Sequence, residues 1–261
     1  LLEIGYKGEI FVTCYENDPK VLNTLSENLT EVSNNVAQFR FRIIKDNFLT
    51  SEPFGGFFKS DEEFDLVIGN PPYKKISSDS AEARNMMEIC YGAPNLYFLF
   101  MAMSVQKLKQ DAQLVYIIPR SWTSGAYFKK FREWLFSRAV IERIHLFGSR
   151  DKVFEGEDVL QETMIIKIRK TRKQPDVVQM TFSETSDFSL VTSINVSYDT
   201  VVGRNSFVYL VTNEREIECL DALSTLHNTL VSDGLRMKTG LIVDFRTRDV
   251  LRNDAEEPNT Y

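Results

Sequence analysis

Short apolar runs alternate with longer amphipathic stretches over the first 170 residues of the chain. The short runs predict strands at residues 10–15, 41–44, 64–68, 114–118, 140–146 and 163–168. Apolar residues spaced by three and four predict helices at residues 19–29, 96–108 and 126–136. Strands separated by helices of this length indicate βαβ units. We therefore expect an α/β fold built on a mostly parallel sheet that is covered on both faces.

The pattern changes towards the end of this region. The last two strands have no long helix between them, so we expect them to pair antiparallel as a hairpin at the edge of the sheet. A polar segment then precedes a stretch without the βα rhythm, where the pattern predicts strands at residues 177–182 and 206–211 and a helix at residues 215–226. This change places a domain boundary between residues 1–172 and a second region at residues 173–261.

Charge is unevenly distributed along the chain. The formal net charge is −6, which argues against a general nucleic-acid coat protein. Residues 119–173 are nevertheless basic, with 13 Lys and Arg against 7 Asp and Glu. This basic segment is either a phosphate-binding face or a solvated surface helix and strand.

Cysteine and histidine are too scattered to indicate a disulfide framework or a metal site. The three cysteines (Cys14, Cys90 and Cys219) form no CxxC pair, which is typical of a reducing compartment. His145 and His227 have no metal-ligand spacing, and His145 alternates with apolar residues as a structural strand position does. We expect neither a signal peptide nor a membrane span within these residues.

Four residues that follow the strand at 64–68 have the chemistry of a catalytic loop. In an open α/β sheet, ligands bind at the carboxyl ends of strands. The Asn70 side-chain oxygen and the Pro71 carbonyl can accept the two hydrogens of an exocyclic amine, which favours a free lone pair on its nitrogen. Pro71 and Pro72 stiffen the loop, and Tyr73 offers a ring for stacking a flat base. The alternative is an ordinary Pro-Pro turn with Tyr73 in routine packing.

A carboxylate also follows the strand at 10–15. Glu16 lies where a Rossmann-like fold binds the hydroxyls of a ribose, and Asn17 would lie next to the adenine ring. The competing interpretation of this turn is a helix cap, and Asp18 before Pro19 is well suited to that role. We expect both interpretations to hold, for different residues.

The strand at 41–44 ends in a third polar turn. Asp46 or Asn47 can read the amine and ring edge of an adenine, and Phe48 can pack on its face. An Asp-Asn turn without any functional role is the alternative.

Taken in order, these segments resemble the motifs of the gamma-class N6-adenine DNA methyltransferases of bacterial restriction–modification systems. The resemblance covers roughly residues 1–170 and rests on segments at residues 65–73, 95–100, 114–122, 128–135 and 152–168. It implies a Rossmann-like, S-adenosylmethionine-dependent methyltransferase fold that acts on a flipped adenine in double-stranded DNA. It also implies a bacterial cytoplasmic location, a restriction endonuclease domain or subunit as partner, and a target-recognition region beginning near residue 173.

The resemblance assigns roles to individual residues. Asn70, Pro71, Pro72 and Tyr73 match the catalytic motif, and Phe154 matches the aromatic residue that stacks on the flipped adenine opposite Tyr73. For the cofactor, Glu16 matches the ribose-binding acid. The next cofactor motif matches less well, because Asn47 separates Asp46 from Phe48, so either polar residue could hold the adenine of the cofactor.

One motif of the family does not occur in this sequence. The glycine-rich loop that binds S-adenosylmethionine is absent, so we expect an N-terminal part of the domain to be missing and cofactor binding by these residues alone to be poor. Two other functions stay open: an enzyme that methylates protein glutamine or RNA guanine, and a non-catalytic DNA-specificity module on a methyltransferase fold.

Overall fold

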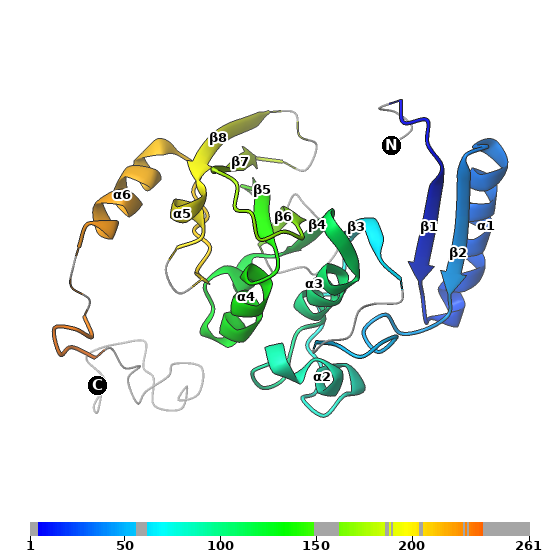
Figure 1. Ribbon diagram of the computed structural model, residues 1–261, viewed down its shortest axis with the longest axis horizontal. Coiled ribbons are helices and arrows are strands. Elements are labelled where there is room, and N and C mark those ends of the chain that lie inside the picture. The colour runs from blue at the N-terminus through cyan, green and yellow to red at the C-terminus, as the bar shows by residue number, and fades with distance from the viewer. Residues whose placement is uncertain are drawn as a thin grey trace, which may run out of the picture. The chain divides into compact units, whose positions relative to one another are not determined.

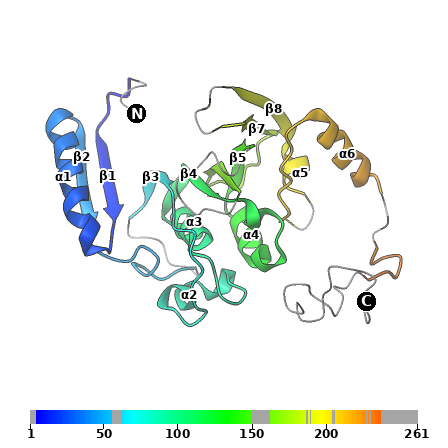
Figure 2. The same ribbon diagram turned by 180° about the vertical axis from the view of Figure 1, so that it is seen from behind.

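The computed structural model describes residues 5–55, 62–148, 162–185, 188, 190–203, 206–226, 228 and 230–236. Its first sheet has two parallel strands, β1 (Ile10–Tyr15) and β2 (Phe39–Ile44). Helix α1 (Pro19–Asn35) connects them and lies beside β2 in both Figure 1 and Figure 2. Asp18 caps this helix by accepting from the Lys20 amide at 2.9 Å, as its place before Pro19 predicts.

The second sheet has six strands in the order β3-β4-β6-β5-β7-β8. Their bounds are Phe64–Gly69, Leu108–Pro119, Thr163–Arg169, Val140–Phe147, Val177–Ser183 and Val191–Ser197 in that order. The pairs β3–β4 and β5–β7 are parallel, whereas β6 is antiparallel to both of its neighbours and β8 is antiparallel to β7. Strands β3, β4, β5 and β7 therefore run in one direction, which confirms the α/β fold with a mostly parallel sheet.

The hairpin of β5 and β6 is antiparallel as expected, but it does not lie at the sheet edge. Strand β6 lies between β4 and β5, and β7 continues the sheet on the other side of β5. Strand β8 was not predicted, because polar residues separate its apolar residues Val191, Ile194 and Val196, so it lacks the apolar run that marks the other strands. Its pairing with β7 supplies the context that its own residues do not signal.

The strand expected at residues 206–211 is wrong. Val208 makes only an isolated bridge to Val202, and its amide donates to the Thr123 carbonyl at 2.9 Å. Val208 is thus hydrogen-bonded to a distant segment instead of to the neighbouring strand that the apolar residues predicted. By contrast, the helix expected at residues 215–226 is confirmed as α6 (Glu214–Ser224).

Two helices, α3 and α4, contribute many of the buried apolar residues outside the strands. Helix α3 (Leu96–Lys107) is buried along most of its length, and β4 begins directly after it at Leu108. Helix α4 (Lys129–Phe136) follows the short turn η3 (Ala126–Phe128), so the helix expected at residues 126–136 is divided into these two elements. The remaining short elements are α2 (Ala81–Asn85), η1 (Met87–Ile89), η2 (Arg120–Thr123) and α5 (Tyr198–Val201).

The chain divides into a compact unit at residues 1–217 and a second unit at residues 218–261. Strands β7 and β8 belong to the first unit, since they continue the same sheet. A functional boundary at residue 172 therefore remains a prediction, because strand pairing continues across it. Among the residues that the structure describes, no helix combines the length and apolar character needed to cross a membrane.

Candidate active site

The Asn70–Tyr73 loop begins at the carboxyl end of β3, where the parallel strand β4 also ends. Gly69, the last residue of β3, is opposite Tyr116 of β4. A Cβ atom at residue 69 would lie 3.0 Å from the Tyr116 ring, so glycine allows this ring to pack against the backbone just before Asn70. Within the loop, Asn70 is exposed and Pro71 is buried. The start of the loop is thus packed against the protein, while the Asn70 carboxamide is exposed to solvent.

Tyr73 is hydrogen-bonded to the same loop. Its hydroxyl lies 2.8 Å from the Asn70 Oδ1 atom and 3.1 Å from the Ile117 carbonyl oxygen. Burial raises the pKa of Tyr73 to about 12, so the hydroxyl keeps its proton and acts as a donor. A carbonyl oxygen has two lone pairs, so Asn70 can accept from Tyr73 and still accept a second hydrogen bond.

The loop is also fixed on its far side to the start of α3. The Leu96 amide donates to the Lys74 carbonyl, and the Ile76 amide donates to the Pro94 carbonyl, both at 2.8 Å. These bonds place the first turn of α3 beside Tyr73. The ring of Tyr97, in this turn, meets the Tyr73 ring edge to face, with centroids 6.4 Å apart and planes at 87°.

Tyr97 is itself held by the segment that follows β4. Its ring is 1% exposed, and its hydroxyl lies 3.0 Å from the Ser121 Oγ atom. Tyr97 also packs against Phe98 and Phe128, which belong to the aromatic core between α3 and α4. The position of the Tyr73 ring is therefore set by a rigid, buried neighbour.

Several basic side chains of the segment at residues 119–173 are engaged inside the protein. The Arg120 guanidinium donates to the Phe147 carbonyl at 2.5 Å, across the ends of β4 and β5. Intramolecular partners are likewise found for the buried or half-buried side chains of Arg132, Lys167, Arg169 and Lys170. The side chains of Lys129, Lys130, Arg143, Arg172 and Lys173 are exposed, and that of Lys129 pairs with Glu133 at 3.8 Å.

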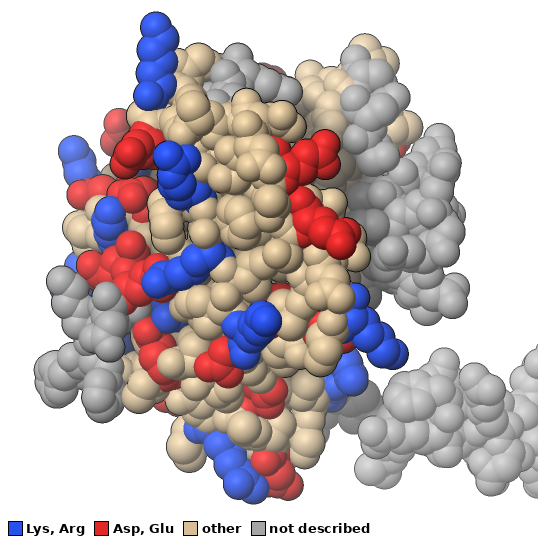
Figure 3. Space-filling model, turned by 90° about the vertical axis from the view of Figure 1, so that its right-hand side faces the viewer, with Lys and Arg blue, Asp and Glu red and all other residues tan. Residues whose placement is uncertain are grey.

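Charge on another face is finely mixed. Figure 3 views the side on which α1 lies in Figure 1, where basic and acidic side chains alternate around uncharged surface. Lys74 and Lys75, which directly follow the Asn70–Tyr73 loop, are both exposed and are further candidates for a phosphate contact.

The residues expected to bind the ribose and adenine of the cofactor lie at the carboxyl ends of β1 and β2. The Glu16 amide donates to the Ile44 carbonyl at 3.1 Å, which brings the two strand ends side by side. One oxygen of the half-buried Glu16 carboxylate accepts from the Asp18 amide at 2.7 Å. Asn17, in the same turn, is exposed.

The turn after β2 separates the two polar residues that the sequence left as alternatives. Asn47 Oδ1 accepts from the Leu49 amide at 3.0 Å, and its Nδ2 donates to Glu82 at 2.7 Å. Both ends of this side chain are therefore used within the protein. Asp46 is exposed and accepts from the Asn47 amide at 2.7 Å through Oδ1. Asp46 is the more accessible of the two side chains.

Phe48 is half-buried in an aromatic group that reaches α3. Its ring stacks on Phe100 with centroids 5.5 Å apart and meets Tyr15 edge to face at 5.0 Å. Phe100 lies three residues after Tyr97, on the same side of α3. The two groups of predicted site residues thus contact one face of a single helix. Phe154 lies outside the described residues.

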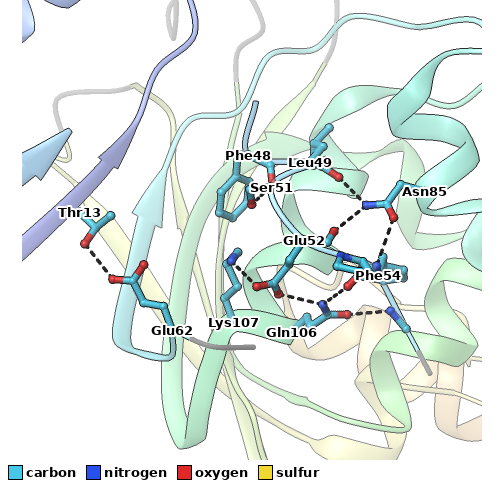
Figure 4. A network of polar contacts seen from close by, with 12 residues as sticks. Thr13, Phe48, Leu49, Ser51, Glu52, Phe54, Glu62, Asn85, Gln106 and Lys107 are labelled. Carbon is cyan, nitrogen blue, oxygen red and sulfur yellow. Dashed lines mark hydrogen bonds and ion pairs between the residues drawn. The ribbon is translucent and has the colours of Figure 1, made fainter. Parts of the chain in front are cut away.

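The sequence analysis missed the residues that hold the turn after β2 in place. Lys107, at the end of α3, pairs with Glu52 over 2.6 Å, and Asn85 and Gln106 bind the backbone of the same turn (Figure 4). The available signal was a charged residue inside the helical pattern at residues 96–108. The partner could not be found from sequence, because it lies 55 residues away.

A family model and two curated relatives match this chain. A family model described as Eco57I restriction-modification methylase matches residues 10–154, more than half of the chain. The type II methyltransferase M.PstI of Providencia stuartii is 31% identical over 92% of this chain and 49% of its own length. M.BsuBI of Bacillus subtilis is 34% identical over 74% of this chain and 39% of its own length.

A solved structure supports the fold assignment. The modification subunit of a putative type I restriction enzyme from Vibrio vulnificus YJ016 has a TM-score of 0.60 at 14% identity, and the match covers 84% of this chain and 53% of that one. The present chain spans about half or less of the length of the two curated relatives.

Proposed function

The chain belongs to the Eco57I restriction-modification methylase family, and on this basis we propose that it is part of an S-adenosylmethionine-dependent enzyme that methylates N6 of adenine in double-stranded DNA. The observation that carries the proposal is the fixed Asn70–Tyr73 loop at the end of β3, inside the matched residues. The relatives M.PstI and M.BsuBI are type II methyltransferases, which favours DNA over protein or RNA as substrate.

The amine of adenine is the group that this loop is suited to hold. Its lone pair is delocalised into the ring, so it is a poor nucleophile until both hydrogens are engaged by acceptors. We assign these acceptors to the Asn70 Oδ1 atom and the Pro71 carbonyl. Because Tyr73 and the anchored backbone fix their direction, they act without reorganisation during the transfer.

The adenine must leave the duplex to reach this loop, which costs a few kcal/mol of unstacking and unpairing. Stacking on Tyr73 is worth roughly 1–3 kcal/mol and offsets part of this cost. We propose that Phe154 covers the other face of the base, as the family resemblance predicts. Contacts between exposed cations and DNA phosphates would contribute the remainder.

The residues at the ends of β1 and β2 fit the nucleoside part of S-adenosylmethionine. Glu16 would accept hydrogen bonds from the ribose hydroxyls, with Asn17 at the edge of that site. Asp46, rather than Asn47, would read the adenine amine, because the Asn47 side chain is engaged with Leu49 and Glu82. Phe48 would pack beside the adenine ring. When bound, the cofactor supplies the methyl group on its positively charged sulfur.

The proposal extends to the protein as a whole. We propose that residues 173–261 begin a target-recognition region, that the enzyme acts with a restriction endonuclease domain or subunit, and that it works in the bacterial cytoplasm.

Product analysis tests the substrate class. The full-length protein would be incubated with methyl-labelled S-adenosylmethionine and, separately, with duplex DNA, total RNA and cell protein. Nucleoside digests of the DNA should contain labelled N6-methyladenine, while RNA and protein stay unlabelled. Label confined to RNA or protein would contradict the proposal, and so would an absence of label from all three substrates.

A further inference from the structure

The turn after β2 is held by side chains from two helices that are distant in sequence. The Asn85 amide group, at the end of α2, donates to the Leu49 carbonyl at 2.8 Å and to the Glu52 carbonyl at 3.0 Å. These bonds fix the backbone on both sides of residues 50 and 51. Figure 4 shows Asn85 pointing into the turn from its helix.

Gln106, near the end of α3, holds the same turn further along. Its Nε2 atom donates to the Pro53 carbonyl and to Glu52 Oε1, both at 2.9 Å, and its Oε1 atom accepts from the Gly55 amide at 2.8 Å. These side chains satisfy backbone groups of the turn that have no partner in regular secondary structure.

A buried ion pair completes the network. Lys107 Nζ lies 2.6 Å from Glu52 Oε2, and the side chains are 3% and 15% exposed. The ammonium group also lies 5.6 Å from the centroid of the Tyr15 ring. Desolvating two charges is costly, so such a pair contributes little net stability, but loss of the Glu52 charge would leave the Lys107 ammonium buried without its ion-pair partner. A geometric role explains this arrangement better than a stabilising one.

The geometry in question is that of the proposed cofactor site. Asp46 and Phe48 begin the turn that Glu52 fastens, and Tyr15, under the Lys107 ammonium, also meets the Phe48 ring. Phe48 stacks on Phe100, which lies two turns before Lys107 on the same face of α3. The ion pair is therefore linked to the aromatic group of Tyr15, Phe48 and Phe100 in two ways. Its ammonium group contacts Tyr15, and Lys107 belongs to the helix that carries Phe100.

We propose that Glu52 and Lys107 are positioning residues that hold Asp46 and Phe48 in the geometry needed to bind the adenosine part of S-adenosylmethionine. This proposal rests on the proposed function. It assigns the pair a role in cofactor affinity, without direct contact with the cofactor and without a part in the chemical step.

The test compares buried and exposed ion pairs on neighbouring residues of the full-length protein. Lys107→Met should raise the Kd for S-adenosylmethionine, measured by isothermal titration, by about tenfold, which corresponds to about 1.4 kcal/mol. The single-turnover rate at saturating cofactor and the affinity for DNA should stay as in the unaltered protein. Lys109→Met is the matched control, because Lys109 pairs with Asp65 at 2.9 Å with exposures of 49% and 83%, and its Kd should not change.

Further variants guard against a trivial loss of folding. Glu52→Gln keeps the size of the side chain, and it should also weaken cofactor binding. Combining it with Lys107→Met should restore part of the affinity, because the double variant no longer carries the Lys107 ammonium that Glu52→Gln leaves without its ion-pair partner. If Lys107→Met does not fold, Glu52→Gln decides the question by the same titration.

Some results would contradict the positioning role, and another would contradict the proposed function. A cofactor Kd within about twofold of the unaltered protein in the deciding variant, a change of about 0.4 kcal/mol, overturns the positioning role. An equal loss of affinity for DNA and for cofactor would also overturn it, since that indicates general destabilisation. Failure of the unaltered full-length protein to bind S-adenosylmethionine would instead contradict the proposed function itself.

Discussion

At the scale of single residues, Asn70 and Tyr73 form one unit, because the Tyr73 hydroxyl lies 2.8 Å from the Asn70 side-chain oxygen. This bond fixes which way the carboxamide points. It also gives Tyr73 two separable roles, one through its ring and one through its hydroxyl. Substitutions that remove one role at a time can measure both.

Tyr73→Phe and Tyr73→Leu separate these roles. Tyr73→Phe keeps the ring and loses one neutral hydrogen bond worth about 1 kcal/mol, so methyl transfer should slow by about fivefold at most. Tyr73→Leu also loses base stacking, worth roughly 1–3 kcal/mol, and should weaken extrusion of the base further. Single-turnover rates and the fluorescence of DNA with 2-aminopurine at the target adenine would report the two effects. Equal losses in both variants would contradict the role of the ring.

His145 is a structural residue whose burial has a consequence for pH. Its ring nitrogens lie 2.9 Å from Thr181 Oγ1 and 3.0 Å from Ser183 Oγ, and burial lowers the pKa of the ring from its ordinary value of 6.5. Below that pH the unfolded chain binds a proton that the folded protein resists. The contribution of His145 to stability is therefore present above pH 6.5 and is lost as the pH falls through and below it.

Thermal unfolding across this range checks the sign. The melting temperature of the unaltered protein should fall more steeply on acidification below pH 6.5 than that of His145→Gln, which has no group to titrate there. Identical slopes for the two proteins would show that His145 does not contribute.

At the scale of elements, helix α3 connects the two groups of predicted site residues. Tyr97 meets Tyr73, Phe100 meets Phe48, and Lys107 meets Glu52, all from one face of the helix. The apolar run made this helix easy to predict. Its role as a common support could not be predicted, because each of these contacts joins residues far apart in sequence.

The difference between local sequence signals and contacts between distant residues also explains which strands could be predicted from the sequence. Strand β1 was predicted at its observed bounds, since an apolar run with polar ends is a local signal. Strand β8 was missed and the strand at residues 206–211 was wrong, because pairing with β7 in one case and with Thr123 in the other decided the outcome. The local sequence pattern predicts an element well when the element's own apolar residues determine its structure. It predicts poorly when hydrogen bonds to a distant segment determine the structure.

Truncation tests whether β7 and β8 belong to the catalytic domain. They continue its sheet, and Arg132 of α4 packs 5.0 Å from the centroid of the Phe207 ring. Two variants would be compared, one truncated after Arg172 and one truncated after Ser224. We expect the melting temperature of the first to be at least about 5 °C below that of the second. The exposed edge of β5 should also promote aggregation. Equal melting temperatures would instead support an independent domain that ends at residue 172.

At the scale of the whole molecule, the proposed function requires DNA to bind to a chain whose formal net charge is −6. Overall charge does not favour this, so local cations must provide the phosphate contacts. The intramolecular bonds of Arg120, Arg132 and Lys170 reduce the part that the basic segment can play. Exposed lysines beside the Asn70–Tyr73 loop are the better candidates.

Salt dependence measures such a contact directly. If Lys74 neutralises one phosphate, Lys74→Ala should reduce the slope of log Kd against log salt by about 0.9 and weaken binding to all sequences alike. Lys20→Ala, on exposed α1, is the control and should leave the slope unchanged. An unchanged slope in Lys74→Ala would exclude a phosphate contact at this residue.

The central claim is that Asn70 activates an adenine amine for methyl transfer. The most direct measurement is the single-turnover rate of methyl transfer to N6 of adenine in duplex DNA by full-length Asn70→Ala, at saturating S-adenosylmethionine. Loss of one preorganised hydrogen-bonding group costs about 100- to 1,000-fold in rate, so the account predicts a rate lower by at least that factor, with the Kd for S-adenosylmethionine unchanged. A variant that methylates adenine at a rate close to that of the unaltered enzyme would contradict the account.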